Sequence, residues 1–226
     1  MRRFAVAETS GLIFAYFGRD ITKPRWHTPI FPSDSMARGL RRMTFRAHPQ
    51  TTSENSVDMS HLEEVHGYTQ LTKLRETEMC GPFLFSSYSF TRNMLTFGLR
   101  RIKFDVEIQI GVWGLGVSTV NVATEYGILA RQWVLSTPVD GEMIEMWLIV
   151  DIRKLPNWWW LKSLLRTPAA KLASKFAVND LEIEVSKDAL IWDKQNYRSQ
   201  PAYSASDRDI ALFRRYCQQF YPKVIQ

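Results

Sequence analysis

Apolar and polar residues alternate along much of the chain, a pattern that predicts an antiparallel sheet followed by helices. Residues 3–8 and 12–17 are short alternating runs around Thr9-Ser10-Gly11, and together they predict a hairpin. Residues 41–47 predict a further strand. Between Tyr68 and Ile149 β-branched and aromatic residues dominate, and this stretch has room for about five or six antiparallel strands.

Proline, glycine and helix-start signals divide the remaining segments. Residues 22–37 contain three prolines and predict an irregular crossing loop, and residues 137–141 predict a turn. Thr167-Pro168 predicts a helix start that leads past Trp192, because a capping hydroxyl precedes a proline at the first helical position. Residues 206–220 predict a shorter last helix. The expected fold class is α+β, with an antiparallel sheet wrapped on a long C-terminal helix in a helix-grip (START-like) arrangement.

A helix-grip fold encloses an apolar cavity, and several strand residues are candidates to line it. The simpler interpretation is that aromatic residues in strands belong to the core. Glycines inside strands predict bulges or places where a ligand approaches the backbone closely, and Gly111, Gly114 and Gly116 recur here. The candidate lining residues are Phe83, Phe85, Tyr88, Phe90, Val112, Trp113, Val117 and Val120.

Composition narrows the class of protein further. The chain has 226 residues, of which 45% are hydrophobic, as expected of one sizeable globular domain. Its two cysteines, Cys80 and Cys217, lie far apart, so no disulfide framework is expected and a reducing, cytoplasmic location is favoured. The first residues do not form a secretory signal, and no apolar stretch reaches the roughly 18 residues that a membrane-spanning helix needs.

His61 and His66 are two of only four histidines, and such a close pair can hold two corners of a metal site. The separation of five excludes the His-Glu-x-x-His motif of zinc proteases, in which both histidines share one helical face. Five residues turn about 140° on a regular helix, so the helix must loosen or end between the two. Gly67 suits the left-handed residue that closes a helix. We therefore expect His61 on the last regular turn and His66 at its frayed end.

The pattern Asn55-x-x-Asp58-x-x-His61-x-x-x-x-His66-Gly67 resembles the iron-binding segment of Rieske-type non-haem iron oxygenases. It is most similar to the 3-ketosteroid 9α-hydroxylase oxygenase component and the cholesterol 7-desaturases. Four other stretches agree in order along the chain, so that the resemblance covers nearly all of it. They are residues 11–16, which look like the strand linking that family's two domains, 135–142, 188–195 and 213–221.

The resemblance implies that the chain is a mononuclear-iron catalytic domain, residues 1–226. His61 and His66 would be the imidazole ligands of one Fe(II), and Asp188 would supply the carboxylate. Two histidines and one carboxylate form a facial triad that leaves positions open for O2. Spacing alone does not choose Asp188, because Glu184 lies one turn earlier on the same helical face and Asp193 one turn later on another. The alternative interpretation of each acid is a solvated helix carboxylate.

The same resemblance gives roles to two catalytic candidates and predicts a missing domain. Asp58 would bridge His61 to the histidine of an incoming Rieske cluster, and Asn55 would lie near the open coordination positions. A Rieske [2Fe–2S] cluster needs two cysteines and two histidines, and no histidine follows closely behind Cys80 or Cys217. The Rieske domain is therefore expected to be absent from these residues, and a [2Fe–2S] cluster is expected only on a partner or a missing domain.

Two surface features predict further partners. Trp158, Trp159 and Trp160 cannot all face one core, and beside basic residues they favour peripheral contact with a membrane. A lid over the cavity, a subunit contact and plain packing are the alternatives. The net charge of +6 favours an anionic partner. A cluster of arginines precedes the segment that resembles the iron-binding segment. It could bind an acidic iron–sulfur protein or anionic lipid, and the alternative is a solvated charged face. The sequence contains no pattern typical of nucleic-acid binding. The cluster is Arg38, Arg41, Arg42 and Arg46.

These features together predict an enzyme that hydroxylates or desaturates a steroid or sterol-like hydrophobic substrate with O2. Its electrons would come from a separate iron–sulfur protein and a reductase. The alternatives are a non-catalytic helix-grip module that binds lipid or sterol and a truncated oxygenase fragment. Iron analysis of the protein and of its His61→Ala variant would discriminate between a metal site and a lipid container.

Overall fold

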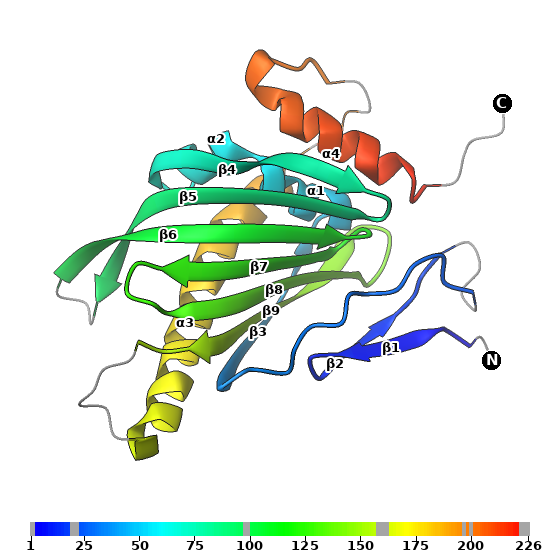
Figure 1. Cartoon of the computed structure of the whole chain (residues 1–226). Coiled ribbons are helices and arrows are strands. Elements are labelled where there is room, and N and C mark those ends of the chain that lie inside the picture. The colour runs from blue at the N-terminus through cyan, green and yellow to red at the C-terminus, as the bar shows by residue number, and fades with distance from the viewer. Residues whose placement is uncertain are drawn as a thin grey trace, which may run out of the picture.

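A seven-stranded antiparallel sheet forms the centre of the computed structural model (Figure 1), which describes residues 3–18, 23–96, 100–156, 163–195, 198 and 201–221. The strand order is β3-β9-β8-β7-β6-β5-β4. Six strands lie between Thr69 and Lys154, which agrees with the expected five or six. The strands are β3 (Ala37–Arg46), β4 (Thr69–Cys80), β5 (Phe83–Thr96), β6 (Arg100–Trp113), β7 (Val117–Thr124), β8 (Leu129–Pro138) and β9 (Met143–Lys154).

Every second residue of these strands points to one face of the sheet, where the core lies. In β5, Leu84 and Tyr88 are completely buried, and they pair with Val112 and Ile108 of β6. The same alternation continues in β9, whose Met146, Leu148 and Val150 are also completely buried. The sequence pattern of period two therefore produces a sheet with a continuous apolar inner face.

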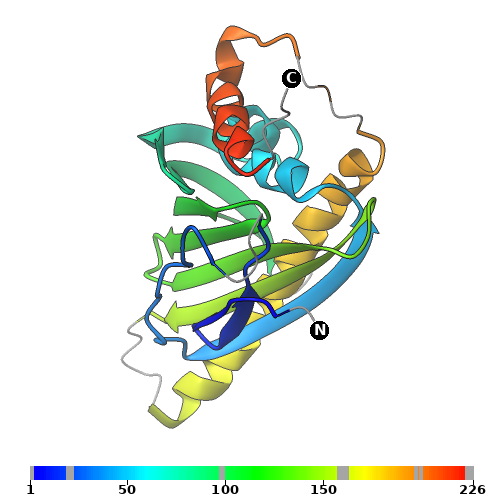
Figure 2. The same cartoon turned by 90° about the vertical axis from the view of Figure 1, so that its right-hand side faces the viewer.

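The long helix α3 (Ser163–Trp192) crosses this inner face, as Figures 1 and 2 show. Its Ala170, Val178, Val185 and Trp192 are buried in one core cluster with side chains of β9. A sheet closed over one long helix is the helix-grip arrangement, so the expected α+β fold class is confirmed. The helix ends at Trp192, close to where the sequence predicted.

The start of α3 differs from the prediction. The helix already includes Ser163, so Thr167-Pro168 lies inside it and does not cap it. Proline at the first helical position is favoured because that position needs no N–H partner. Further along, a proline removes one backbone hydrogen bond. Packing outweighs this loss here, since Ala169, Ala170 and Ala173 lie against the core just after the proline.

Gly39 of β3 marks the closest approach of α3 to the sheet. A Cβ atom on Gly39 would lie 2.4 Å from the Ser174 carbonyl oxygen and 2.8 Å from Val178 Cγ1. We expect Gly39→Ala to push α3 away from β3 and to lower the free energy of unfolding by about 1–3 kcal/mol, the usual cost of overpacking. Urea denaturation followed by circular dichroism measures the change. Gly141→Ala is the control, because nothing lies within 4 Å of its Cβ; equal losses would contradict the explanation.

The N-terminal segment covers part of the outer face of the sheet. Its hairpin, β1 (Val6–Thr9) and β2 (Leu12–Ala15), has the predicted turn at Ser10-Gly11, where both residues have positive φ. The Phe31 ring lies 5.0 Å from the Trp133 ring and 5.8 Å from the Trp113 ring. The described residues before β3 form no further strand, in agreement with the expected irregular loop.

This arrangement corrects the expected cavity lining. Trp113 contacts Phe31, Phe83 and Phe85, so these rings lie on the outer face and cannot line a cavity beside α3. Val117 pairs directly with Trp113 and shares its face. The error arose because adjacent residues of a strand point to opposite faces. The expected residues on the inner face are Tyr88, Phe90, Val112 and Val120, of which the first three are buried core.

Short helices close one end of the sheet (Figures 1 and 2). They are α1 (Pro49–Glu54), the 3₁₀ turn η1 (Asn55–Val57), α2 (Met59–Glu64), the 3₁₀ turn η2 (Ala205–Asp207) and α4 (Arg208–Gln218). The last helix was predicted. Its Phe213 and Tyr216 are completely buried against β5 and β6, and the Tyr216 hydroxyl donates to the Pro82 carbonyl oxygen at 2.8 Å. This packing holds the short helices in place at the end of the sheet where His61 and His66 lie.

Acidic side chains neutralise the charges of the arginine cluster in and around β3. Each of the four forms an ion pair with a residue of β9, α3 or the turn before β9, so the expected docking face is not an isolated basic patch. The pairs are Arg38 with Asp151, Arg41 with Glu182, Arg42 with Glu145 and Arg46 with Glu142.

Two expectations about membranes have different outcomes. Among the described residues, none of the helices combines the length and the apolar character that crossing a bilayer requires. Trp158, Trp159 and Trp160 lie outside the described residues, so their contact with a membrane surface stays a prediction.

Candidate metal centre

The segment from Pro49 to Glu64 consists of three short helical pieces, and the caps of these helices position the two histidines. The His48 Nδ1 atom accepts the Gln50 backbone N–H at 3.1 Å and caps α1. The Asp58 Oδ1 atom accepts the His61 backbone N–H at 3.1 Å and caps α2. A carboxylate at this position satisfies one of the free N–H groups at the helix start. His61 therefore has a defined place in the first turns of α2.

The end of α2 brings the second histidine back toward the first. The helix stops at Glu64, and Gly67 has a φ of 68°, the left-handed conformation that lets the chain turn into β4. The His61 and His66 rings are consequently 4.7 Å apart and almost perpendicular, at 87°. The helix that ends between the two histidines was predicted from their spacing and from Gly67.

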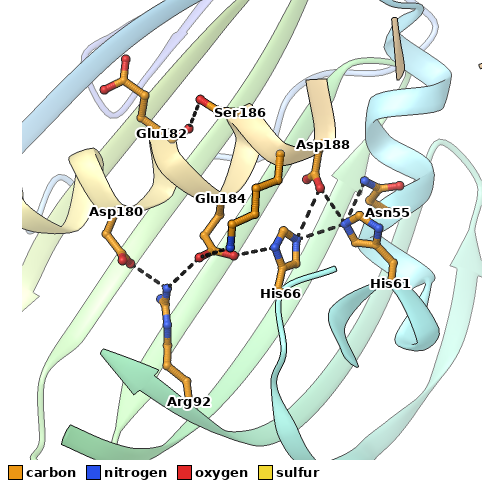
Figure 3. A network of polar contacts seen from close by, with 10 residues as sticks. Asn55, His61, His66, Arg92, Asp180, Glu182, Glu184, Ser186 and Asp188 are labelled. Carbon is orange, nitrogen blue, oxygen red and sulfur yellow. Dashed lines mark hydrogen bonds and ion pairs between the residues drawn. The ribbon is translucent and has the colours of Figure 1, made fainter. Parts of the chain in front are cut away.

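Asp188 of α3 meets both imidazoles (Figure 3). Its Oδ1 atom lies 3.0 Å from His61 Nε2 and 3.7 Å from His66 Nε2, and the two Nε2 atoms are 3.0 Å apart. The three ligand atoms all lie within 4.8 Å of one another. The His61 and Asp188 side chains are only 9% and 8% exposed, and the His66 side chain 8%. Residues 61, 66 and 188 therefore form one buried, convergent group.

The polar atoms of this group cannot all be satisfied by one another. An imidazole Nε2 atom carries either one proton or one lone pair. Nevertheless His66 Nε2, Asp188 Oδ1 and Asn55 Nδ2 all lie within 3.1 Å of His61 Nε2. Asp188 Oδ1 is buried and has no hydrogen bond to any described residue. These polar atoms lie close together but have too few protons to form hydrogen bonds with one another. Such an arrangement is expected where the atoms share a bound cation.

The distances also fit a first-row metal ion. Two atoms bound at about 2.1 Å and at right angles lie about 3.0 Å apart. The His61 Nε2 atom is 3.0 Å from each of the other two ligand atoms. Two nitrogens and one carboxylate oxygen are the donor set of the facial triad that binds Fe(II). The residues present therefore fit the Fe(II) ion that the family resemblance implies.

The second ring nitrogen of His66 contacts an acid that the sequence left as an alternative ligand. Glu184 Oε2 lies 2.5 Å from His66 Nδ1, as an ion pair that is not aligned as a good hydrogen bond. Burial favours the protonated form of this carboxyl, but the contact and charge of His66, with Arg92 and Lys187, keep the pKa of Glu184 below its ordinary value. Glu184 therefore lies behind His66, on the side opposite to Asp188.

A charged network continues from Glu184 to the sheet (Figure 3). Arg92 of β5 lies 2.8 Å from Asp180 and 3.7 Å from Glu184, and Lys187 lies 3.3 Å from Glu184. Burial favours the neutral form of Arg92, yet Tyr68, Asp180 and Glu184 hold the pKa of its guanidinium above the ordinary value. Burial raises the pKa of Asp180. These residues connect α3 to β5 beside the histidines.

Of the remaining predicted residues, Asn55 and Asp58 contact His61, whereas Asp193 does not belong to the group. Asn55 Nδ2 is 3.1 Å from His61 Nε2, so this amide lies beside the ligand atoms. The Asp58 carboxylate reaches the backbone of His61, where it serves as a helix cap, and its predicted bridging role stays a prediction. Asp193 is exposed at the end of α3 and lies outside the group.

The sequence analysis missed Arg92, Tyr68 and Asp180. A signal for the first was available, because alternation in β5 places Arg92 on the same inward face as Tyr88 and Phe90. A charge at an inward position needs a partner. The signal for Asp180 was its position four residues before Glu184, which itself lies four residues before Asp188; this spacing puts all three carboxylates on one side of α3.

Comparison with known proteins identifies a matching family and two relatives. Residues 16–221 match the family described as the 3-ketosteroid 9alpha-hydroxylase C-terminal domain. The cholesterol 7-desaturase of Bombyx mori is 24% identical over 236 residues, a match that covers 98% of this chain and 49% of the relative. The cholesterol 7-desaturase of Xenopus laevis is 23% identical, and the match covers 95% of this chain and 50% of the relative. The chain thus spans about half the length of the curated relatives it matches.

Solved structures share the fold. NdmA of Pseudomonas putida CBB5 with caffeine has a TM-score of 0.64 and 16% identity, and the match covers 96% of this chain and 61% of that chain. Dicamba monooxygenase bound to dicamba has a TM-score of 0.60 and 13% identity, with 96% and 69% covered. At these identities the likeness concerns the arrangement of sheet and helices.

Proposed function

The chain belongs to the 3-ketosteroid 9α-hydroxylase C-terminal domain family, the catalytic domains of Rieske-type non-haem iron oxygenases, and from this premise we propose that it oxidises a steroid or sterol-like substrate with O2 at one Fe(II) ion. The observation that carries the proposal is the convergence of His61 and His66 with Asp188, three ligand atoms from two distant segments within 4.8 Å. The domain range 1–226 is part of the same proposal.

The residues of the site would hold the metal and keep water away from it. His61 Nε2, His66 Nε2 and Asp188 Oδ1 would bind the ion on one side and leave the opposite positions open. Bound there, Fe(II) would supply the reductive activation of O2, and the protein supplies binding and orientation. Asn55 would hold its amide beside the open positions. Asp58 would keep α2 in place through its cap and face an incoming electron donor.

The inner face of the sheet supports an apolar substrate. Val120, Val122 and Val134 project toward α3 from the middle strands, and they are only partly buried. These side chains would give a hydrophobic ligand an apolar surface to contact. The family and the cholesterol 7-desaturase relatives point to a steroid or sterol, which would be hydroxylated or desaturated.

Electrons would have to come from outside these residues. A Rieske cluster requires two cysteines and two histidines close together. Cys80 is exposed at the end of β4 and Cys217 is buried in α4, and the sequence around them has no nearby histidine. We propose that a separate iron–sulfur protein and its reductase deliver the electrons.

Turnover with defined substrates tests this proposal. The protein is loaded with Fe(II) without oxygen, mixed with a ferredoxin, a reductase and NADH, and given isotope-labelled O2 with either a 3-ketosteroid or cholesterol. We expect mass spectrometry to show a product with one labelled oxygen atom, or a product that has lost two hydrogen atoms. If the steroid binds but no O2 is consumed with any electron donor, the protein is a lipid-binding module and the enzymatic proposal fails.

A further inference from the structure

We propose that Glu184 is a positioning residue that fixes the His66 ring for metal binding, and that Arg92 holds Glu184 and Tyr68 in place for this task. The inference rests on the proposed function, because it takes His66 to be a metal ligand. It goes further in assigning a task to three residues that do not touch the metal themselves.

The contacts of His66 place one acid at each ring nitrogen. Nε2 faces Asp188 and His61, at 3.7 Å and 3.0 Å, while Nδ1 faces Glu184 Oε2 at 2.5 Å. The Glu184 side chain is only 16% exposed, so water competes little for this contact. A neutral imidazole has one protonated nitrogen and one free lone pair. A carboxylate at Nδ1 favours the proton there and leaves the Nε2 lone pair for the metal.

Tyr68 supports the same ring from its face. Its ring centroid lies 5.5 Å from that of His66 at an angle of 32°, and it stacks on Phe90 at 4.3 Å with an angle of 7°. Phe90 belongs to the buried core of the sheet. The orientation of the His66 ring is therefore coupled to the core through Tyr68 and to α3 through Glu184.

Arg92 contacts both supports. Its guanidinium lies over the Tyr68 ring at 5.4 Å and within 3.7 Å of Glu184, and its strongest contact is with Asp180 at 2.8 Å. Asp180 and Glu184 lie one helical turn apart on α3, and Asp188 lies one turn further. Figure 3 shows Asp180, Glu184 and Asp188 directed toward the same side of the helix. One helix thus carries both a ligand and the residue that orients another ligand.

A purely structural role is the competing explanation for these contacts. In that case the network would only tie α3 to β5, and the loss of Glu184 would lower the stability of the metal-free protein without changing metal affinity in the folded state. Metal affinity and the spectrum of the bound metal are therefore the informative measurements, because the loss of a purely structural contact would leave both unchanged.

The test compares four variants, and the fourth of them is Asp180→Asn. Glu184→Leu removes the carboxylate beside Nδ1, and Glu184→Gln keeps an oxygen there but removes the negative charge. Glu182→Gln makes the same change as Glu184→Gln on the opposite side of α3 (Figure 3). Fe(II) affinity is measured by competition with a chelator under anaerobic conditions. Co(II) absorption reports the coordination geometry. Circular dichroism confirms that each variant is folded.

We expect Glu184→Leu to weaken Fe(II) binding about 10- to 100-fold, the usual effect of losing a residue that orients a metal ligand. The Fe(II) affinity of Glu184→Gln should lie between those of Glu184→Leu and the wild type, and the affinity of Glu182→Gln should equal that of the wild type. The Co(II) spectrum should change for Glu184→Leu and stay constant for Glu182→Gln. Asp180→Asn weakens the ion pair with Arg92 and does not alter a contact of His66. It should therefore lower the Fe(II) affinity less than Glu184→Leu does.

The outcomes separate the two proposals. If the wild type binds no Fe(II) or Co(II), the proposed metal centre fails and the role of Glu184 fails with it. If the wild type binds metal and folded Glu184→Leu binds it with equal affinity and an unchanged Co(II) spectrum, only the positioning role is overturned. In that case Glu184 and Arg92 merely connect α3 to β5.

Discussion

Replacing His61 with alanine is expected to abolish stoichiometric Fe(II) binding, from about one ion per chain to a trace, and turnover with it. The His61 Nε2 atom lies 3.0 Å from both other ligand atoms, so it is the centre of the group. Its removal leaves one imidazole and one carboxylate, which cannot complete a facial triad. The loss of affinity should exceed the roughly 10- to 100-fold cost of removing a residue behind a ligand.

Metal analysis after anaerobic loading and gel filtration measures this effect. Asp188→Ala should lose the ion in the same way, since Asp188 Oδ1 is the only carboxylate oxygen in the group. His27→Ala is the matched control: it removes an exposed histidine that takes no part in the group and should keep the full iron content. Full iron content in both His61→Ala and Asp188→Ala would rule out this site, whatever the activity of the protein.

The second large effect concerns a largely buried ion pair that connects α4 to α1, just before the segment that carries the two histidines. Arg214 of α4 contacts both carboxylate oxygens of Glu54 in α1, at 2.7 Å and 2.9 Å, and the side chains are only 15% and 13% exposed. We expect Glu54→Gln to lower the free energy of unfolding by about 2–4 kcal/mol, because it weakens two charge-assisted hydrogen bonds of a pair that is largely shielded from water. Glu54 directly precedes Asn55, so a looser α1 should also weaken Fe(II) binding.

Chemical denaturation of the metal-free protein measures this cost, and a double variant identifies its cause. Glu54→Met with Arg214→Met removes both charges and should recover most of the lost stability, since apolar pairs often replace buried ion pairs without loss. Glu142→Gln breaks the exposed pair with Arg46 and should cost less than about 1 kcal/mol. If the double variant lost as much stability as the two single variants together, the remaining Arg214 charge would not be the cause of the loss in Glu54→Gln.

Local patterns in the sequence predicted most of the secondary structure. Alternation indicated the strands, Ser10-Gly11 the hairpin, and Gly67 the end of the helix that carries His61. These features depend on neighbours within a few residues, so they can be recognised without knowledge of the fold. The wrong helix start at Thr167-Pro168 has the same origin, because a local capping signal competes with packing that it does not contain.

The choice of carboxylate required the tertiary structure. Periodicity places Asp180, Glu184 and Asp188 on one side of α3, but it cannot say which of them meets a histidine from a segment more than a hundred residues away. That choice depends on how far α3 is shifted along the sheet, which is set by contacts such as the approach of Ser174 to Gly39. The resemblance to a known family named Asp188 as the ligand, and the structure places its Oδ1 atom 3.0 Å from His61 Nε2 and 3.7 Å from His66 Nε2.

The sequence by itself therefore determined which segments form strands and helices, and which residue types could hold a metal ion. The tertiary structure decided which of these residues meet. It paired the four arginines with acids, turned Trp113 and its neighbours to the outer face, and placed Glu184 and Tyr68 around His66. The physical reason is that side-chain direction follows from the local backbone, whereas contact between distant segments depends on the packing of the whole core.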